Sequence, residues 1–251
     1  MRLFHAWLSS ASRRVRLCLA EKGIAYESVA VDLSRQEQHA PEFLAMNPNG
    51  VVPALEVAPG RFLHESATIC EYLDDLQPAP PLRPADPFER AVLRNFVRWT
   101  DEKLLPNLLI LNWSQMLQPT AQRWSDDELA QKLARIPTAE RREAWVRIAR
   151  QPYNDEEKAA ARRKLLALVE RMEEMLQAAP WLVGGAYSLA DIAALPFIAR
   201  IAEIEPAALE GASHSRTQAW WQAVRQRPAF AAARLQRFDE AAEERERNLN
   251  L

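Results

Sequence analysis

Glycine and long apolar runs are scarce in this chain. It has 6 glycines among 251 residues, whereas soluble proteins average about 7% glycine. Because sandwiches and barrels use glycine at many turns, this scarcity favours helices. No apolar run approaches the roughly 18 residues of a membrane-spanning helix, and residues 1–10 lack the apolar stretch of a signal peptide. We therefore expect a cytoplasmic protein with no membrane partner.

Cysteine and excess positive charge are also in short supply. The chain has 2 cysteines, Cys18 and Cys70, and neither belongs to a CxxC pair or has a histidine at metal-ligand spacing. We therefore expect two free buried thiols, with no disulfide framework and no bound metal. The net charge is −2. Since no basic excess is available to neutralise phosphates, nucleic-acid binding is not expected.

The first 77 residues alternate short apolar runs with helical patterns. The expected strands are residues 2–5, 26–31, 51–57 and 61–64, and the expected helices are residues 12–22, 41–46 and 65–76. Gly23 follows the first helix as a natural stop, and Asn47-Pro48-Asn49-Gly50 signals a turn. The order βαβαββα predicts a small mixed sheet covered by helices.

The pattern changes after a proline-rich linker at residues 78–87, in which the prolines are expected to stiffen the chain. Residues 88–251 are expected to form an all-helical domain. Its expected elements are one long helix over residues 88–116 with a kink at Pro106, short helices within 118–153, and helices over 154–178, 188–204 and 217–225. The charged segment 240–247 is expected to be a solvated tail.

Three short features of the first 77 residues suit the binding and activation of a thiol peptide. The first is Val52-Pro53, where a proline after a turn and before an apolar strand is a candidate cis-peptide. A cis bond would leave the N–H and C=O of Val52 free to pair with an extended peptide. The alternative is an ordinary proline on an edge strand.

The second feature is Glu65-Ser66, at an expected strand-to-helix junction. A helix N-terminus presents N–H groups that can bind a carboxylate, and Ser66 adds a hydroxyl donor. Glu65 could accept a hydrogen bond from an ammonium group. The alternative is a plain helix cap.

The third feature is the serine-rich start of the first helix, Ser9-Ser10-Ala11-Ser12. A hydroxyl can donate to a thiolate, and the helix N-terminus stabilises the negative charge. The alternative is again a helix cap. A serine nucleophile is not expected, because the chain has no G-x-S-x-G motif and no recognisable Ser-His-Asp arrangement.

Together these motifs resemble the glutathione S-transferase family over residues 1–230. The matching segments are residues 9–16, 42–55 and 65–73, with Ser188-Leu189-Ala190-Asp191 similar to the family's helix-capping box, flanked by Tyr187 and Ile192 as a hydrophobic staple. The resemblance implies a thioredoxin-like α+β domain over residues 1–77 and an all-α domain over 88–251. It also implies a homodimer and glutathione as the co-substrate.

The resemblance assigns roles to individual residues. The backbone of Val52 would bond the cysteinyl part of glutathione, and Glu65 and Ser66 would bind its γ-glutamyl end. Gln38 and His39 stand where plant-type classes place groups for the glycine carboxylate. The alternative for His39 is a loop histidine that faces solvent.

The resemblance leaves the residue that activates the thiol open among three serines. Ser9 occupies the usual serine position, Ser12 aligns better with the β-aryl-etherase branch, and Ser10 is the third candidate. Serine rather than cysteine at position 9 argues against reductase chemistry through a mixed disulfide. Ala11 replaces a cysteine of maleylacetoacetate isomerases, which disfavours that activity.

The acceptor pocket is expected on the long helix after the linker and beside the serine turn. The candidates are Trp7, Leu8, Asn107, Leu111, Trp113 and Met116. Such side chains suit a small hydrophobic electrophile, although each could equally be a core residue. We expect a transferase reaction. The alternatives are glutathione-dependent β-aryl ether cleavage or isomerisation, suggested by the linker and the long 118–154 stretch, and a non-catalytic protein that binds hydrophobic ligands.

Overall fold

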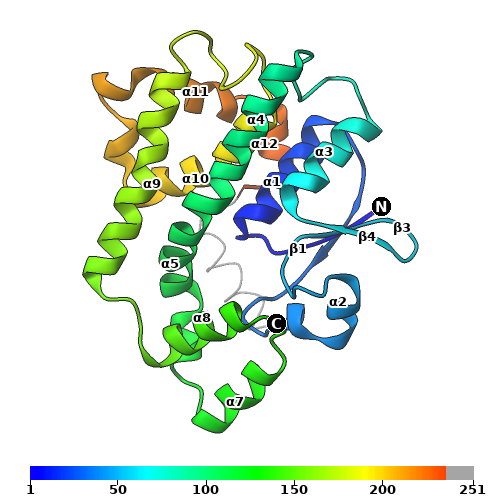
Figure 1. Cartoon of the computed structure of the whole chain (residues 1–251), viewed down its shortest axis with the longest axis vertical. Coiled ribbons are helices and arrows are strands. Elements are labelled where there is room, and N and C mark those ends of the chain that lie inside the picture. Colours follow the sequence, from blue (N-terminus) through cyan, green and yellow to red (C-terminus); the bar gives the residue numbers. More distant parts are fainter. Residues whose placement is uncertain (236–251) are drawn as a thin grey trace.

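A computed structural model describes residues 1–235 of the protein, so the expected tail at 240–247 lies outside the described residues. A small sheet with its own helices is followed by a larger helical part (Figure 1). This arrangement confirms the predicted α+β domain with a thioredoxin-like fold and the all-α domain. Within residues 1–235 no helix has both the length and the apolar character needed to cross a membrane.

The sheet has four strands in the order β2-β1-β3-β4. The strand β1 pairs in parallel with β2 and antiparallel with β3, which pairs antiparallel with β4. The strands are β1 (Arg2–His5), β2 (Glu27–Ala30), β3 (Ala54–Ala58) and β4 (Arg61–His64), and the helices are α1 (Ser10–Glu21), α2 (Pro41–Met46) and α3 (Ser66–Leu76). The predicted order βαβαββα is confirmed.

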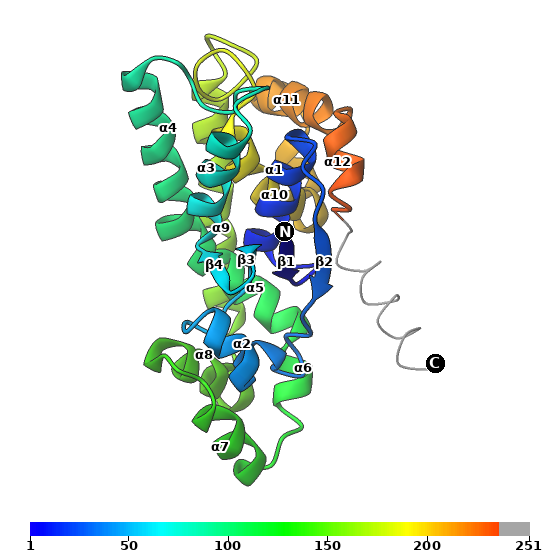
Figure 2. The ribbon, with the colours of Figure 1, turned by 90° about the vertical axis from the view of Figure 1, so that its right-hand side faces the viewer.

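Alternate strand residues face two different cores, as the two-residue period of a strand requires. Leu3 and Leu55 belong to the large core that includes α1 and α3. Phe4 and Ala54, their immediate neighbours, belong to a smaller core with Phe43 of α2. The sheet is therefore covered on both faces, and α8 lies next to α2 at one end of the molecule (Figure 2).

The helical domain differs from the predicted pattern at its first helix. The single helix expected over residues 88–116 is split into α4 (Pro87–Trp99) and α5 (Leu105–Met116) by one π-helical turn at Thr100–Leu104. Pro106 cannot donate a backbone hydrogen bond, and its ring would clash with the preceding turn of an α-helix. The wider π turn directly before it accommodates the proline, so the irregularity precedes Pro106.

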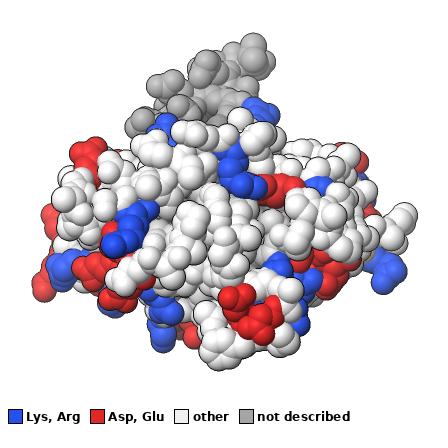
Figure 3. Space-filling view, turned by 90° about the horizontal axis from the view of Figure 1, so that it is seen from above, with Lys and Arg blue, Asp and Glu red and all other residues white. Residues whose placement is uncertain are grey.

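The short helices expected between residues 118 and 153 are present, and they are followed by the three predicted helices and by a fourth, α12, that the sequence did not predict. The helices are α6 (Gln118–Ala121), α7 (Asp126–Ala134), α8 (Ala139–Arg150), α9 (Asp155–Met175), α10 (Leu189–Ile204), α11 (Ser215–Arg225) and α12 (Pro228–Ala232). Seen from the end of the molecule that carries α11 and the top of α4, positive and negative side chains are interspersed between large neutral areas (Figure 3).

The predicted capping box of α10 is confirmed. The Asp191 carboxylate accepts from the backbone N–H of Ser188 at 2.9 Å and from Trp220 Nε1 at 2.7 Å. Complete burial raises the pKa of Asp191 to about 6, although these hydrogen bonds oppose the shift. The N-terminus of α10 is thus fixed in the large core that joins the two domains.

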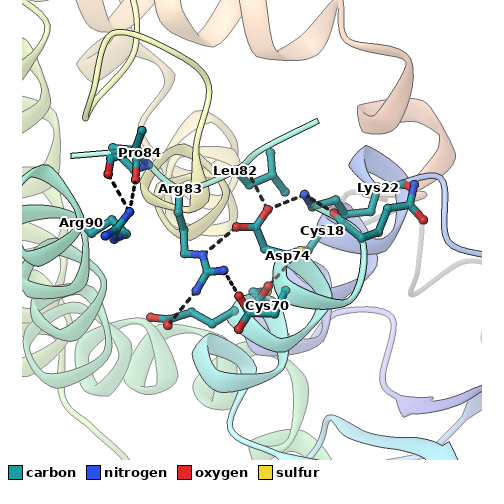
Figure 4. A network of polar contacts seen from close by, with 12 residues as sticks. Cys18, Lys22, Cys70, Asp74, Leu82, Arg83, Pro84 and Arg90 are labelled. Carbon is teal, nitrogen blue, oxygen red and sulfur yellow. Dashed lines mark hydrogen bonds and ion pairs between the residues drawn. The ribbon is translucent and has the colours of Figure 1, made fainter. Parts of the chain in front are cut away.

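The linker between the domains is held by buried charges (Figure 4). Asp74 of α3 accepts from the backbone N–H of Leu82 at 2.9 Å and from Arg83 Nε at 2.6 Å, and it pairs with Lys22. Lys22 is buried and also donates to the backbone oxygen of Gln77 at 2.9 Å. Although burial opposes it, the bonds from Lys22 and Arg83 keep the pKa of Asp74 below its ordinary value. These contacts tie the linker to α3 and to the end of α1.

Candidate active site

A cavity of about 270 Å³ lies between the two domains. The N-terminal domain contributes residues 8–11, Leu33, Gln38, His39, residues 50–53, Glu65 and Ser66, and the helical domain contributes Asp101, Leu105, Leu109, Asn112, Trp113, Met116, Leu117, Arg141 and Trp145. The three features singled out in the sequence therefore meet at one cavity.

The serine turn begins α1. Ser9 is the N-cap, and its Oγ accepts from the backbone N–H of Ser12 at 3.2 Å. Ser9, Ser10 and Ala11 line the cavity, so the first N–H groups of the helix, which have no partner within the helix, lie at the cavity wall. Ser12 does not line the cavity: it is fully buried, and its Oγ accepts from the N–H of Ala6 at 3.3 Å.

The start of α3 is joined to the helical domain by a buried arginine. Arg14 Nη1 donates to Ser66 Oγ at 3.1 Å, and Arg14 makes a two-point contact with Asp101, with its shortest distance at 2.7 Å. Glu65 precedes the helix with a φ of 69°, a strained conformation for a residue other than glycine. Glu65 is the N-cap residue of α3, as the cap interpretation expects, but its side chain makes no capping hydrogen bond.

The loop before β3 lies beside this helix start. The Val52–Pro53 peptide bond is cis, as predicted. Asn47 Nδ2 donates to the backbone oxygen of Val51 at 2.7 Å, which holds the loop. Gly50 has a φ of +60°, and a Cβ there would lie 2.9 Å from His39 Cδ2. This turn therefore requires glycine.

Gln38 and His39 are buried, so the solvent-facing interpretation of His39 is wrong. Gln38 Oε1 and His39 Nδ1 have no hydrogen-bond partner among the described residues, and both residues line the cavity. Burial, assisted by the charge of Arg141, lowers the pKa of His39 to about 4, so the imidazole is neutral at pH 7. Buried polar atoms without partners at a cavity wall indicate a place where a ligand binds.

The wall formed by the helical domain is mainly apolar. Trp113 and Trp145 lie with their ring centroids 5.3 Å apart, and Met116 lines the same wall. Asn112 also lines it, and its Oδ1 accepts from Arg200 Nε at 3.0 Å. The sequence interpretation missed Asn112, although it identified α5 as part of the pocket. It missed Trp145 because α8 and its packing onto α5 have no motif; the tryptophans within the polar 118–153 stretch were the available signal.

Three residues expected in the acceptor pocket lie elsewhere, whereas Leu8, Trp113 and Met116 do line the cavity. The ring of Trp7 has the guanidinium of Arg16 at 4.8 Å and that of Arg234 at 4.6 Å. Asn107 Nδ2 donates to the backbone oxygen of Lys103 at 2.7 Å on the exposed side of α5.

Leu111 is 9% exposed and belongs to the large core. It lies four residues after Asn107, one helical turn further along α5. Leu105, Leu109 and Asn112, on another side of α5, line the cavity instead. The sequence identified the correct helix, but the residues that it singled out there come from both sides of α5.

Comparison with known proteins identifies the family of both domains. Residues 3–81 match the family model described as "Glutathione S-transferase, N-terminal domain", and residues 139–228 match "Glutathione S-transferase, C-terminal domain". Protein LigF of Sphingobium sp. (strain NBRC 103272 / SYK-6) is 40% identical over 177 residues, which cover 69% of this chain and 68% of LigF. A maleylacetoacetate isomerase of Pseudomonas aeruginosa is 39% identical over 51% of this chain and 59% of its own length.

Solved structures agree with these matches. The crystal structure of the β-etherase LigF from Sphingobium sp. strain SYK-6 superposes with a TM-score of 0.84 and 33% identity over 92% of this chain and 97% of that one. Glutathione transferase F7 from Populus trichocarpa gives a TM-score of 0.71 and 25% identity over 94% of this chain and 99% of that one. This chain belongs to the glutathione S-transferase family.

Proposed function

We propose that this protein binds glutathione, ionises its thiol at the serine turn and directs the thiolate at a hydrophobic electrophile. The observation that carries the proposal is the meeting of Ser9, Val52-Pro53 and Glu65-Ser66 at one cavity whose other wall is apolar. A peptide thiol and an apolar acceptor need these two kinds of surface side by side.

Ser9 is the residue that we propose as the thiol activator. Its Oγ already accepts from the N–H of Ser12, which leaves the hydroxyl proton to donate to a sulfur. A free thiol has a pKa near 8.5, and lowering it by two units requires about 2.7 kcal/mol of preferential stabilisation of the thiolate. A hydroxyl hydrogen bond together with a helix N-terminus supplies roughly that amount. Ser10, which also lines the cavity, is the second candidate, and the burial of Ser12 disfavours it.

The positions of the other cavity residues suggest how the rest of glutathione would bind. The backbone of Val52 would pair with the cysteinyl unit, in the manner of an added strand. The start of α3 with Ser66 would bind the γ-glutamyl carboxylate, and the exposed carboxylate of Glu65 would bind its ammonium group. Gln38 and His39 line the same cavity, with His39 beside Gly50, and there the glycine carboxylate would lie.

The acceptor would lie against Trp113, Met116 and Leu8. The thiolate sulfur attacks an electrophilic carbon of the acceptor and forms the C–S bond. Where the acceptor carries a leaving group, that group departs with the electron pair of its broken bond. The protein supplies positioning and stabilisation of the anion, with no covalent enzyme intermediate.

The test is an ultraviolet titration of the thiolate of glutathione bound to the protein, across pH. The wild-type protein should give a bound thiol that titrates well below 8.5, and Ser9→Ala should raise that pKa and slow turnover, with little loss of binding. Ser10→Ala and Ser12→Ala are the matched controls. An unchanged thiol pKa in Ser9→Ala would remove Ser9 as the activator, and an unshifted thiol in the wild-type protein would favour a non-catalytic binding protein.

Glutathione-dependent cleavage of a β-aryl ether is the second candidate function, because of the similarity to the β-etherase LigF over nearly the whole chain. The same thiolate would attack the carbon that bears the aryl ether oxygen, and the C–O bond would break with release of a phenolate. Release of a phenol from a β-aryl ether model compound distinguishes this reaction from conjugation to an aryl halide.

The protein is further proposed to be a homodimer. Phe88, with 76% of its surface exposed, and Val92 lie one turn apart on α4, and Leu76 at the end of α3 is 51% exposed. Apolar side chains presented together on one helix suit an interface. Light scattering should give the mass of two chains, and Phe88→Ser should lower it. The cytoplasmic location remains a prediction.

A further inference from the structure

The cavity has one side chain with a permanent positive charge, and it comes from the helical domain. Arg141, near the start of α8, is the only lysine or arginine among the described residues that line the cavity. Its guanidinium lies over the ring of Trp113, with Cζ 5.6 Å from the ring centroid. Within residues 1–235, no carboxylate forms an ion pair or a hydrogen bond with it.

The charged form of Arg141 is less stable than that of an ordinary surface arginine. Burial lowers the pKa of Arg141, and the more distant charges of Glu140 and Glu65 only partly offset that effect. Arg141 is partly buried, and a partly buried charge without an ion-pair partner is less stable than one in water, so a bound anion would be favoured at this position.

The segment that carries Arg141 packs onto the loop that also supports His39. A Cβ placed on Gly50 would lie 2.9 Å from His39 Cδ2 and 3.3 Å from Pro137 Cδ, so both residues close over the same glycine. The positive charge of Arg141 helps to lower the pKa of His39 by electrostatic repulsion. The unpartnered Gln38 Oε1 and His39 Nδ1 belong to this end of the cavity.

We propose that Arg141 reaches across from the helical domain and binds the glycine carboxylate of glutathione. The inference rests on the proposed function and adds a residue that the family resemblance does not assign. Glutathione has two carboxylates and one ammonium group. The start of α3 suits the γ-glutamyl carboxylate and Glu65 the ammonium, while the neutral imidazole of His39 supplies no charge for the second carboxylate. Arg141 supplies it, so that bound glutathione bridges the two domains.

The experiment measures binding by titration calorimetry with the full chain. The ligands are glutathione and its monoethyl ester, in which the glycine carboxyl is esterified and uncharged. The wild-type protein should prefer glutathione, and Arg141→Gln should weaken glutathione by about tenfold to a hundredfold, as expected for a charge-assisted hydrogen bond. The same variant should change the affinity for the ester by less than about threefold.

Two further variants keep the test decisive. Arg123→Gln makes the same change of charge at an exposed arginine of the same 118–154 stretch, and this variant should bind glutathione as the wild-type protein does. Arg141→Lys retains the charge and should retain most of the preference for glutathione over the ester. Thermal unfolding of each variant reports whether it is folded.

Three binding results would each overturn the proposal: equal binding of glutathione and ester by the wild-type protein, unchanged glutathione affinity in Arg141→Gln, or equal weakening of both ligands in that variant. A change confined to the KM of an acidic acceptor would assign Arg141 to the acceptor and would also overturn it. Failure of the proposed function looks different, since it would appear as an unshifted thiol pKa in wild-type protein that still binds glutathione.

Discussion

The two walls of the cavity are built in different ways. The wall from the N-terminal domain consists of helix starts, a cis-proline loop and small hydroxyl side chains, each in a short local segment. The wall from the helical domain consists mainly of large apolar side chains from α5 and α8, and its polar members are Asp101, Asn112 and Arg141. Polar groups in fixed geometry suit a constant ligand, whereas an apolar surface suits ligands that vary. Sequence motifs therefore indicate the wall that we propose for glutathione, but they do not indicate the wall that we propose for the acceptor.

The largest expected effect comes from replacing Arg14, which contacts Ser66 on one wall and Asp101 on the other. Arg14→Met should lower the free energy of unfolding by about 2–3 kcal/mol. The estimate is at the low end for a buried ion pair because 35% of the Asp101 side chain is exposed. Urea denaturation measures the loss.

The matched control is Arg94→Met, which breaks the exposed pair between Arg94 and Glu71 on α3. This change should cost less than about 1 kcal/mol. Equal losses in the two variants would show that Arg14 does not join the walls more strongly than an ordinary surface pair does.

The second prediction concerns the glycine at which the walls meet. Gly50→Ala should cost about 2 kcal/mol, because a Cβ would sit at 2.9 Å from His39 in addition to the strain of a φ of +60°. Gly60→Ala shares the positive φ, at +72°, but a Cβ there meets nothing within 4 Å, so about 1 kcal/mol is expected. Chemical denaturation of both variants isolates the contact, and identical losses would mean that the loop gives way.

The third prediction separates the walls by ligand. Ser66→Ala should weaken glutathione by about tenfold, since a hydrogen bond to a carboxylate is lost, with little change in turnover at saturation. Met116→Ala should instead raise the KM of an aryl electrophile and leave glutathione affinity unchanged. Calorimetry and steady-state kinetics measure the two effects, and a Met116→Ala variant that binds glutathione poorly would contradict the division.

The smallest expected effect is a change in the pKa of His39, on one wall, when Arg141 on the other wall is replaced. The pKa of His39, about 4, should rise in Arg141→Gln, yet stay well below the ordinary 6.5 because burial is the larger cause. An NMR titration of the imidazole protons measures it. An unfolded chain takes up this proton near pH 6.5 and the folded chain near 4, so His39 lowers the stability as the pH falls through that window. An unmoved pKa would place Arg141 too far from His39 to share a ligand.

The sequence predicted the N-terminal wall because its determinants are local. Each of Ser9, Val52-Pro53 and Glu65-Ser66 stands at the end of a periodic segment, and the expected strands and helices lie within a few residues of the observed ones. The buried imidazole of His39 was harder to predict, since it depends on Pro137 far along the chain closing over Gly50.

The helical wall could be predicted only as far as its first helix. The α5 candidates are predicted from side-chain type, which does not say which side of the helix faces the cavity. Trp113 and Met116 line the cavity, whereas Asn107 and Leu111 do not. Arg141 stands in a polar stretch that looks solvated, and its place at the cavity follows from the packing of α8, which no local pattern encodes.

The burial of the two cysteines determines how readily they undergo thiol–disulfide exchange with a thiol ligand. Cys18 is fully buried and Cys70 is 2% exposed, and their Sγ atoms point at backbone oxygens 3.7 Å and 3.8 Å away. The neighbouring Cys70 and burial raise the pKa of Cys18 well above its ordinary value, so its sulfur stays protonated and a poor partner for exchange. A disulfide reagent will therefore label this chain only when the core between the domains opens, and its labelling rate reports the frequency of that opening.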